Sequence, residues 1–185
     1  YVVSLNYPGQ WFDSNRDAFN LWISHCAGSG IWMAGRGGGH FQNITAYENK
    51  GNGFRPTYDT GWVNCTAGRN GKRGFYIAES AVRLMNCKAW WSGFRIPEAG
   101  WSDYQSNGFS FESNTRGAIA VGCEAQDNYA NGFAFSLVTG HNAYDCIADS
   151  NNRRNGDSVA VSFYNSYNCR FSGQVYDRYN DSVRY

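Results

Sequence analysis

Short segments with alternating apolar and polar residues recur along the chain, and they predict β-strands rather than helices. Phe75-Tyr76-Ile77 and Phe133-Ala134-Phe135 show the pattern, each with two apolar residues around a variable one. A spacing of two places both apolar side chains on one face of a strand. No stretch has the 3.6-residue periodicity of an amphipathic helix. The pattern therefore predicts an all-β protein.

A cysteine motif repeats through the chain. Six cysteines stand in similar contexts, most are followed two residues later by a small or apolar residue, and an isoleucine occupies the same place in a seventh copy. The seven positions are Cys26, Ile44, Cys65, Cys87, Cys123, Cys146 and Cys169. The steps between them are 18, 21, 22, 36, 23 and 23 residues. Regular steps of about 22 residues indicate a solenoid, in which each unit buries its apolar face against its neighbours.

A second motif, Gly-Phe, recurs out of phase with the first. Asn precedes three of its four copies, and Asn-Gly readily adopts positive φ, so each copy marks a sharp corner. Like residues of stacked coils would then lie about 4.8 Å apart along the axis. We predict one inward column from the seven cysteine-motif positions, with buried, reduced thiols, because Ile44 fills the same place. The alternative is three disulfides in a secreted protein. We predict a second inward column from Phe54, Phe75, Phe109 and Phe133.

The Asn-Cys-x-Ala and Asn-Gly-Phe repeats resemble those of the pectin lyase-like superfamily, which includes pectate lyases, alginate epimerases and bacteriophage tailspikes. The resemblance covers roughly residues 18–175. It implies a single-stranded right-handed parallel β-helix of about seven coils. We treat 1–185 as one β-helix domain and, because Tyr1 rather than Met begins it, expect it to be part of a longer polypeptide. The repeated residues point inward, so they carry little information about chemistry.

Composition narrows the function. The net charge of +1 does not favour a nucleic-acid partner. We find no apolar run near 18 residues, so no membrane insertion is predicted. There is no Cys-x-x-Cys and the three histidines are scattered, so we expect no metal and no cofactor. The catalytic signatures of alginate epimerases and polygalacturonases are absent as well.

The 36-residue step contains about 14 extra residues, which we place as a loop insertion near 90–106. Insertions in a solenoid form loops on one face, often the binding face. This one holds three Trp, a Tyr, an Arg and two carboxylates, which suit a saccharide. The predicted contact residues are Trp91, Arg95, Glu98, Trp101, Asp103 and Tyr104, with Trp101 as the stacking platform. Alternatively, these aromatics hold the loop down or pack on a neighbouring subunit.

Two acids beside this loop are catalytic candidates. Glu79 stands five residues after Gly74, and Glu112 stands four after Gly108, so we expect them on adjacent coils. Carboxylates about 5 Å apart suit a retaining glycosidase, although solvated surface acids would produce the same pattern. A lyase would instead need a base and an arginine that neutralises a uronate. The candidate arginines are Arg55, Arg83, Arg95 and Arg116.

Three functions fit the sequence. The first is a tailspike-like or tail-fibre-like adhesion domain that binds cell-surface polysaccharide, at a virion surface or otherwise outside the cell. We expect such a domain to form a homo-oligomer, for instance a trimer, or part of a larger assembly. The second is a polysaccharide lyase or glycoside hydrolase. The third is a purely structural shaft segment, whose mark would be subunit contacts over the insertion.

Overall fold

The computed structural model describes residues 3–5, 16–33, 38–94, 106–113, 115–153 and 159–178. These residues form β-strands and no α-helix, as predicted. The strands build one seven-stranded and one twelve-stranded sheet, and every strand pair is parallel. In the described part of the chain no helix could span a membrane.

Each coil contributes one strand to the seven-stranded sheet and then follows the twelve-stranded sheet around the other side. The seven-stranded sheet consists of β1 (Val3–Leu5), β4 (Ile31–Met33), β7 (Phe54–Arg55), β10 (Phe75–Ile77), β13 (Phe109–Phe111), β16 (Phe133–Ser136) and β18 (Val161–Tyr164). The first half of the other sheet consists of β2 (Ala18–Phe19), β5 (Gly39–Gln42), β8 (Thr60–Val63), β11 (Arg83–Met85) and β14 (Ile119–Val121). Its second half consists of β3 (Trp22–Ser24), β6 (Thr45–Tyr47), β9 (Thr66–Gly68), β12 (Lys88–Trp90) and β15 (Glu124–Gln126). The longer strands β17 (Asn142–Asp149) and β19 (Arg170–Tyr176) run through both halves.

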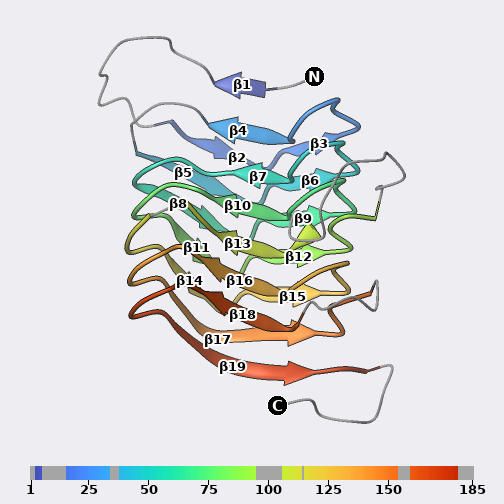
Figure 1. Cartoon of the computed structure of the whole chain (residues 1–185). Coiled ribbons are helices and arrows are strands. Elements are labelled where there is room, and N and C mark those ends of the chain that lie inside the picture. The colour runs from blue at the N-terminus through green and yellow to red at the C-terminus, as the bar shows by residue number, and fades with distance from the viewer. Residues whose placement is uncertain are drawn as a thin grey trace.

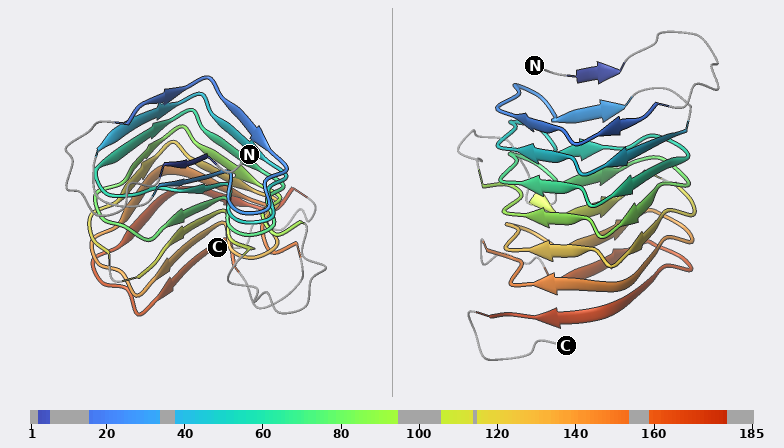
Figure 2. Two further views of the ribbon diagram at one scale, coloured as in Figure 1. Left: turned by 90° about the horizontal axis from the view of Figure 1, so that it is seen from above. Right: turned by 180° about the vertical axis from the view of Figure 1, so that it is seen from behind.

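The coils lie one above another along a common axis, from β1 at one end to β19 at the other (Figures 1 and 2). Neighbouring strands along this axis belong to successive coils, as in β7, β10, β13 and β16. This arrangement is the solenoid that the repeat predicts, because an isolated coil could not bury its apolar face.

Single residues with positive φ turn the chain at the corners of the coil. One corner precedes the Cys/Ile position and carries φ values of 51–62° at Asn43, Asn64, Asn86, Gly122 and Asp145. Asn, Asp and Gly tolerate this left-handed conformation better than other residues. Nδ2 of the Asn64 side chain also donates to Oδ1 of Asn43 in the preceding coil, at 3.4 Å. The chemistry of the corner is therefore repeated from coil to coil.

The predicted phenylalanine column is confirmed. Phe54, Phe75, Phe109 and Phe133 are level with one another in successive strands. Their ring centroids are 4.8–4.9 Å apart, and all four side chains are fully buried. A second column of stacked rings, two residues further along each strand, joins Phe111, Phe135 and Phe163.

The cysteine column is confirmed at five of its seven positions. The strand register aligns Ile44, Cys65, Cys87, Cys123 and Cys146, which are all buried, and the four cysteines are free thiols. The prediction was wrong for Cys26 and Cys169. Trp22 is level with Thr45, so Leu21 rather than Cys26 lies beside Ile44, and the step is 23 residues instead of 18. At the other end, Gly173 is level with Cys146.

The two misplaced cysteines follow other corners of the same coil. Cys26 comes after His25 (φ 59°), at the corner that Glu48 and Arg69 form in the next coils. Cys169 comes after Asn168 (φ 52°), one residue before the start of β19. All these corners share the left-handed conformation, so the residues around them look alike in the sequence. Only the strand register distinguishes them.

A buried asparagine ladder supports the corner after the third strand of each coil. Nδ2 of Asn49 donates to Oδ1 of Asn70 at 2.9 Å, and Nδ2 of Asn128 donates to Oδ1 of Asn151 at 2.8 Å. Ser92 takes the intervening position, where its backbone amide donates to Oδ1 of Asn128 at 3.0 Å. Its hydroxyl is buried without a hydrogen-bond partner. The ladder is therefore interrupted in the coil that carries the extra residues.

Candidate functional site

The outer face of the seven-stranded sheet carries a row of aromatic and guanidinium groups. Between inward-facing neighbours, Trp32 on β4, Arg55 on β7 and Tyr76 on β10 point outward and lie level along the axis. The Arg55 guanidinium carbon lies 4.7 Å from the centroid of the Trp32 ring and 5.3 Å from that of Tyr76. Both distances are within the range of a cation–π contact. Arg55 therefore bridges two aromatic rings along the solenoid axis.

A second arginine approaches the same tyrosine. The guanidinium carbon of Arg73 lies 4.4 Å from the centroid of the Tyr76 ring. Arg73 also donates from Nε and Nη2 to the two carboxylate oxygens of Glu112, both at 2.9 Å. Only 8% of the Arg73 side chain and 17% of the Glu112 side chain are exposed. A bidentate pair with little exposure fixes the orientation of the guanidinium.

The extra residues of the long coil end beside this row. Trp90 is level with Gly68 and Gln126 in the neighbouring coils, and Ser92 still occupies the ladder position. At the other end, the Gly74 amide donates to the carbonyl of Asn107 at 3.0 Å. Asn107 is thus next to Arg73, one coil further along. Asn107, which follows the extra residues, therefore lies next to the Arg73–Tyr76 surface.

Trp91 lies at the corner where these extra residues begin. Its ring centroid is 5.3 Å from that of Phe94 in an edge-on contact and 6.3 Å from that of Tyr129. The Arg69 guanidinium lies over Phe94, 4.2 Å from the ring centroid. Trp91 is therefore packed into an aromatic cluster that holds the first turn of the insertion. The other predicted contact residues, Arg95, Glu98, Trp101, Asp103 and Tyr104, lie outside the described residues.

The two candidate acids differ in surroundings. The Glu112 amide donates to the carbonyl of Ile77 at 2.9 Å, and Phe111 is level with Ile77. Glu112 is therefore level with Ala78, and Glu79 is level with Ser113. The two acids lie on neighbouring coils, offset by one residue. Both oxygens of Glu112 contact Arg73, but Glu79 has no hydrogen bond or ion pair to any residue described in the structure. This geometry suits Glu112 to orienting Arg73, and catalysis by the pair stays a prediction.

The candidate arginines are spread over different surfaces. Arg55 lies in the aromatic row, whereas Arg83 points outward from β11 in the other sheet. Arg116 is exposed at an isolated bridge to Thr139, and Arg95 lies outside the described residues. His141 faces the interior, with Nε2 3.1 Å from the Thr115 hydroxyl, and burial lowers its pKa. Among the residues that the structure describes, no cluster of His, Cys, Asp or Glu could hold a metal ion.

Trp32, Tyr76 and Arg73 were not predicted as site residues. Trp32 and Tyr76 each stand between two inward apolar residues, and an alignment of these middle positions would have placed them in one outward row. No comparable signal pairs Arg73 with Glu112, because 39 residues separate them.

Several proteins of known structure share this architecture. No family model matches the chain, and no curated protein matches its sequence. Solved structures do match it. Tailspike protein 2 of the Escherichia coli O157:H7 bacteriophage CAB120 is 19% identical, with a TM-score of 0.68, over 92% of this chain and 23% of the tailspike chain. The chain is a right-handed parallel β-helix.

Two enzymes have the same fold. Pectate lyase Pel9A is 18% identical to this chain, with a TM-score of 0.57, over 80% of this β-helix and 46% of the lyase. The A-module of the Azotobacter vinelandii mannuronan C-5 epimerase AlgE4 is 13% identical, with a TM-score of 0.59, over 89% and 50% of the two chains. This β-helix thus spans half or less of each matched structure. Identities this low establish a shared fold and no shared chemistry.

Proposed function

We propose that this β-helix binds a polysaccharide on the outer face of its seven-stranded sheet. One observation carries the proposal: Trp32, Arg55, Tyr76 and Arg73 form a continuous row of aromatic and guanidinium groups on this face. Aromatic faces pack against the C–H faces of sugar rings, and guanidinium groups donate hydrogen bonds to hydroxyls or carboxylates. Two of the similar structures are named for enzymes that act on pectate and mannuronan, which supports the same ligand class.

The dimensions of the row fit a polymer better than a single sugar. Trp32 and Tyr76 lie two coils apart, which corresponds to roughly 10 Å along the axis. They can therefore contact different residues of one glycan chain. Because ion pairing and cation–π contacts already hold both arginines in place, binding immobilises few additional side chains. Preorganisation of this kind favours affinity.

The insertion supplies the second part of the proposed site. Its end adjoins Arg73, so the loop residues can contact the same glycan. We assign the additional contacts to Trp91, Arg95, Glu98, Trp101, Asp103 and Tyr104. In this proposal Trp101 stacks on a sugar ring. The proposed setting is a tailspike-like recognition domain, oligomeric and displayed at a virion surface or otherwise outside the cell.

Binding to immobilised polysaccharides and glycan arrays tests the proposal. Trp32→Ala, Tyr76→Ala and Trp101→Ala should each weaken binding about fivefold or more, since a stacked sugar ring contributes roughly 1–3 kcal/mol. Trp22→Ala is the matched control, because Trp22 is an exposed tryptophan on β3, in the other sheet. Equal loss in the control, or no binding of the parent protein to any polysaccharide, would refute the proposal and favour a structural shaft.

The Glu79 carboxylate, which has no hydrogen-bond or ion-pair partner among the described residues, favours a second candidate function, a polysaccharide lyase or glycoside hydrolase. Glu79 follows the strand of Tyr76 and lies on the coil next to Glu112. Incubation with neutral and acidic polysaccharides should then release reducing ends or unsaturated products. Glu79→Gln should abolish product release and leave binding intact. Absence of products across the panel would leave binding as the function.

A further inference from the structure

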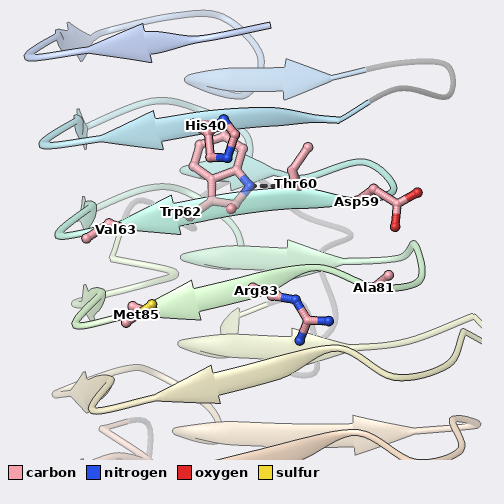
Figure 3. Close-up of a pocket in the computed structure, with 9 residues that line it drawn as sticks. His40, Asp59, Thr60, Trp62, Val63, Ala81, Arg83 and Met85 are labelled. Atoms are coloured by element: carbon pink, nitrogen blue, oxygen red, sulfur yellow. Dashed lines mark hydrogen bonds between the residues drawn. The ribbon is translucent and has the colours of Figure 1, made fainter. Parts of the chain in front are cut away.

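A hollow opens on a different face of the solenoid, on the outer surface of β5, β8 and β11. Its volume is about 450 Å³, within the usual range of small-molecule sites. Figure 3 shows His40 on one side of β8 and Arg83 on the other, with Asp59 at one end and Val63 and Met85 at the other end. None of these residues belongs to the aromatic row on the seven-stranded sheet.

The hollow exists because a glycine replaces a side chain in an outward row. His40, Gly61 and Arg83 are level in three successive strands, and all three positions face outward. A Cβ atom added to Gly61 would lie 3.7 Å from the His40 ring, an ordinary contact distance. Neither packing nor backbone conformation therefore demands glycine here, and the strand would be more stable with a larger residue. A glycine that the fold does not need suggests that the space itself is used.

The floor of the hollow is rigid. Behind Gly61, the buried Trp62 ring stacks on Phe41 with centroids 4.1 Å apart. The Trp62 indole donates to the Thr60 hydroxyl at 3.0 Å, and Thr60 donates to the carbonyl of Thr57 at 2.7 Å. The backbone of β8 is therefore fixed from the inside and cannot move outward to close the space.

The polar groups around the hollow are mixed in sign and available. The side chains of Arg83 and Asp59 make no hydrogen bond or ion pair with any residue described in the structure. Nδ1 of His40 lies 3.3 Å from Asp17, which leaves Nε2 on the other side of the ring. The hollow thus offers hydrogen-bond donors and a carboxylate acceptor along His40, Arg83 and Asp59. Its other end is an apolar patch of Val63 and Met85, and the Met85 side chain is half exposed.

We propose that this hollow binds one neutral hexose residue. Vicinal hydroxyls both donate and accept hydrogen bonds, so they match the Asp59 carboxylate together with the Arg83 guanidinium. The C–H face of the ring would lie on Val63 and Met85 over the Gly61 backbone. An acidic sugar fits less well, because the negative charge of Asp59 offsets the positive charge of Arg83. This site is independent of the polysaccharide surface proposed above.

Two-dimensional ¹H–¹⁵N NMR tests the hexose site directly. We would titrate the protein with the methyl glycosides of glucose, galactose, mannose and N-acetylglucosamine, and with methyl glucuronide. At least one neutral glycoside should shift the amide signals of His40, Gly61 and Arg83, with a Kd in the millimolar range. No shift with any neutral glycoside at about 50 mM, or shifts with the glucuronide alone, would overturn the proposal.

Gly61→Val is the decisive variant. It fills the hollow, and a β-branched residue suits a strand, so the melting temperature should stay the same or rise while the glycoside shifts disappear. Thr66→Val is the control, since it introduces the same residue at an outward position on β9, away from the hollow. Arg83→Gln and Asp59→Asn should each weaken glycoside binding at least fivefold. Undiminished binding by Gly61→Val would refute the site, whatever the Trp32 variants do.

Discussion

The Arg73 guanidinium and the Glu112 carboxylate join two neighbouring coils through two hydrogen bonds of 2.9 Å. The pair lies beside Tyr76, whose ring centroid is 4.4 Å from the guanidinium carbon of Arg73. One contact therefore couples the stability of the solenoid to the surface on which we propose that a polysaccharide binds.

Glu112→Gln should destabilise the fold by about 2 kcal/mol, because it removes the carboxylate charge that faces the largely buried Arg73 guanidinium. Urea unfolding measures this loss. The Lys88–Glu124 pair provides the control, since its side chains are 38% and 30% exposed. Glu124→Gln should change the free energy of unfolding by less than about 1 kcal/mol. Equal effects of the two substitutions would mean that the Arg73–Glu112 pair is solvated like a surface pair.

Phe75→Ala should lower the free energy of unfolding by about 3–5 kcal/mol. The ring is fully buried and stacks on Phe54 and Phe109, at 4.8 and 4.9 Å, and the strands on either side cannot move into the vacated space. Phe163→Ala is the comparison, because that ring is half exposed and stacks on Phe135 at 4.8 Å. We expect it to cost less than half as much. A loss below about 1 kcal/mol for Phe75→Ala would contradict its place in the column.

Ser92→Asn should raise the free energy of unfolding by about 1 kcal/mol, because it restores the asparagine ladder. The Ser92 hydroxyl is buried without a partner, whereas an amide there could accept from Asn70 and donate to Asn128. Gly74 adjoins this position as Gly53 adjoins Asn70, so the larger side chain has room. Thermal unfolding of Ser92→Asn and of the reverse change, Asn70→Ser, provides the test. Destabilisation by both would show that the ladder does not extend through this coil.

The native protein should expose one of its six thiols to a thiol reagent. Cys169 is partly exposed, and the other five are buried. Burial raises the pKa of the Cys87 thiol well above its usual value, so this group stays protonated and unreactive in the folded state. In the unfolded chain the Cys87 thiol ionises near pH 9.0, but in the folded protein it stays protonated. The free energy of unfolding should therefore be unaffected by Cys87 below pH 9.0 and should fall as the pH rises above it. Rapid reaction of five or six thiols in the native protein would contradict the column.

The sequence alone determined which residues face the interior. Phe75 and Phe109 occupy equivalent positions in successive coils. A period of two in a strand places every second side chain on one face. Ile44 in place of cysteine marked the column as apolar and reduced. Stacked identical coils follow from these residues, since one coil cannot bury its apolar face by itself.

Only the tertiary structure decided the alignment of the end coils and the outward contacts. Cys26 and Cys169 follow corners with the same left-handed backbone as the corner before Cys65, so local sequence could not separate them. The strand register separates them, because the backbone hydrogen bonds to the neighbouring coil fix which residues lie side by side. Outward residues do not pack into the common core, so the repeat does not determine which of them come into contact. Arg73 and Glu112 are 39 residues apart in the sequence, so their contact depends on how neighbouring coils stack in space.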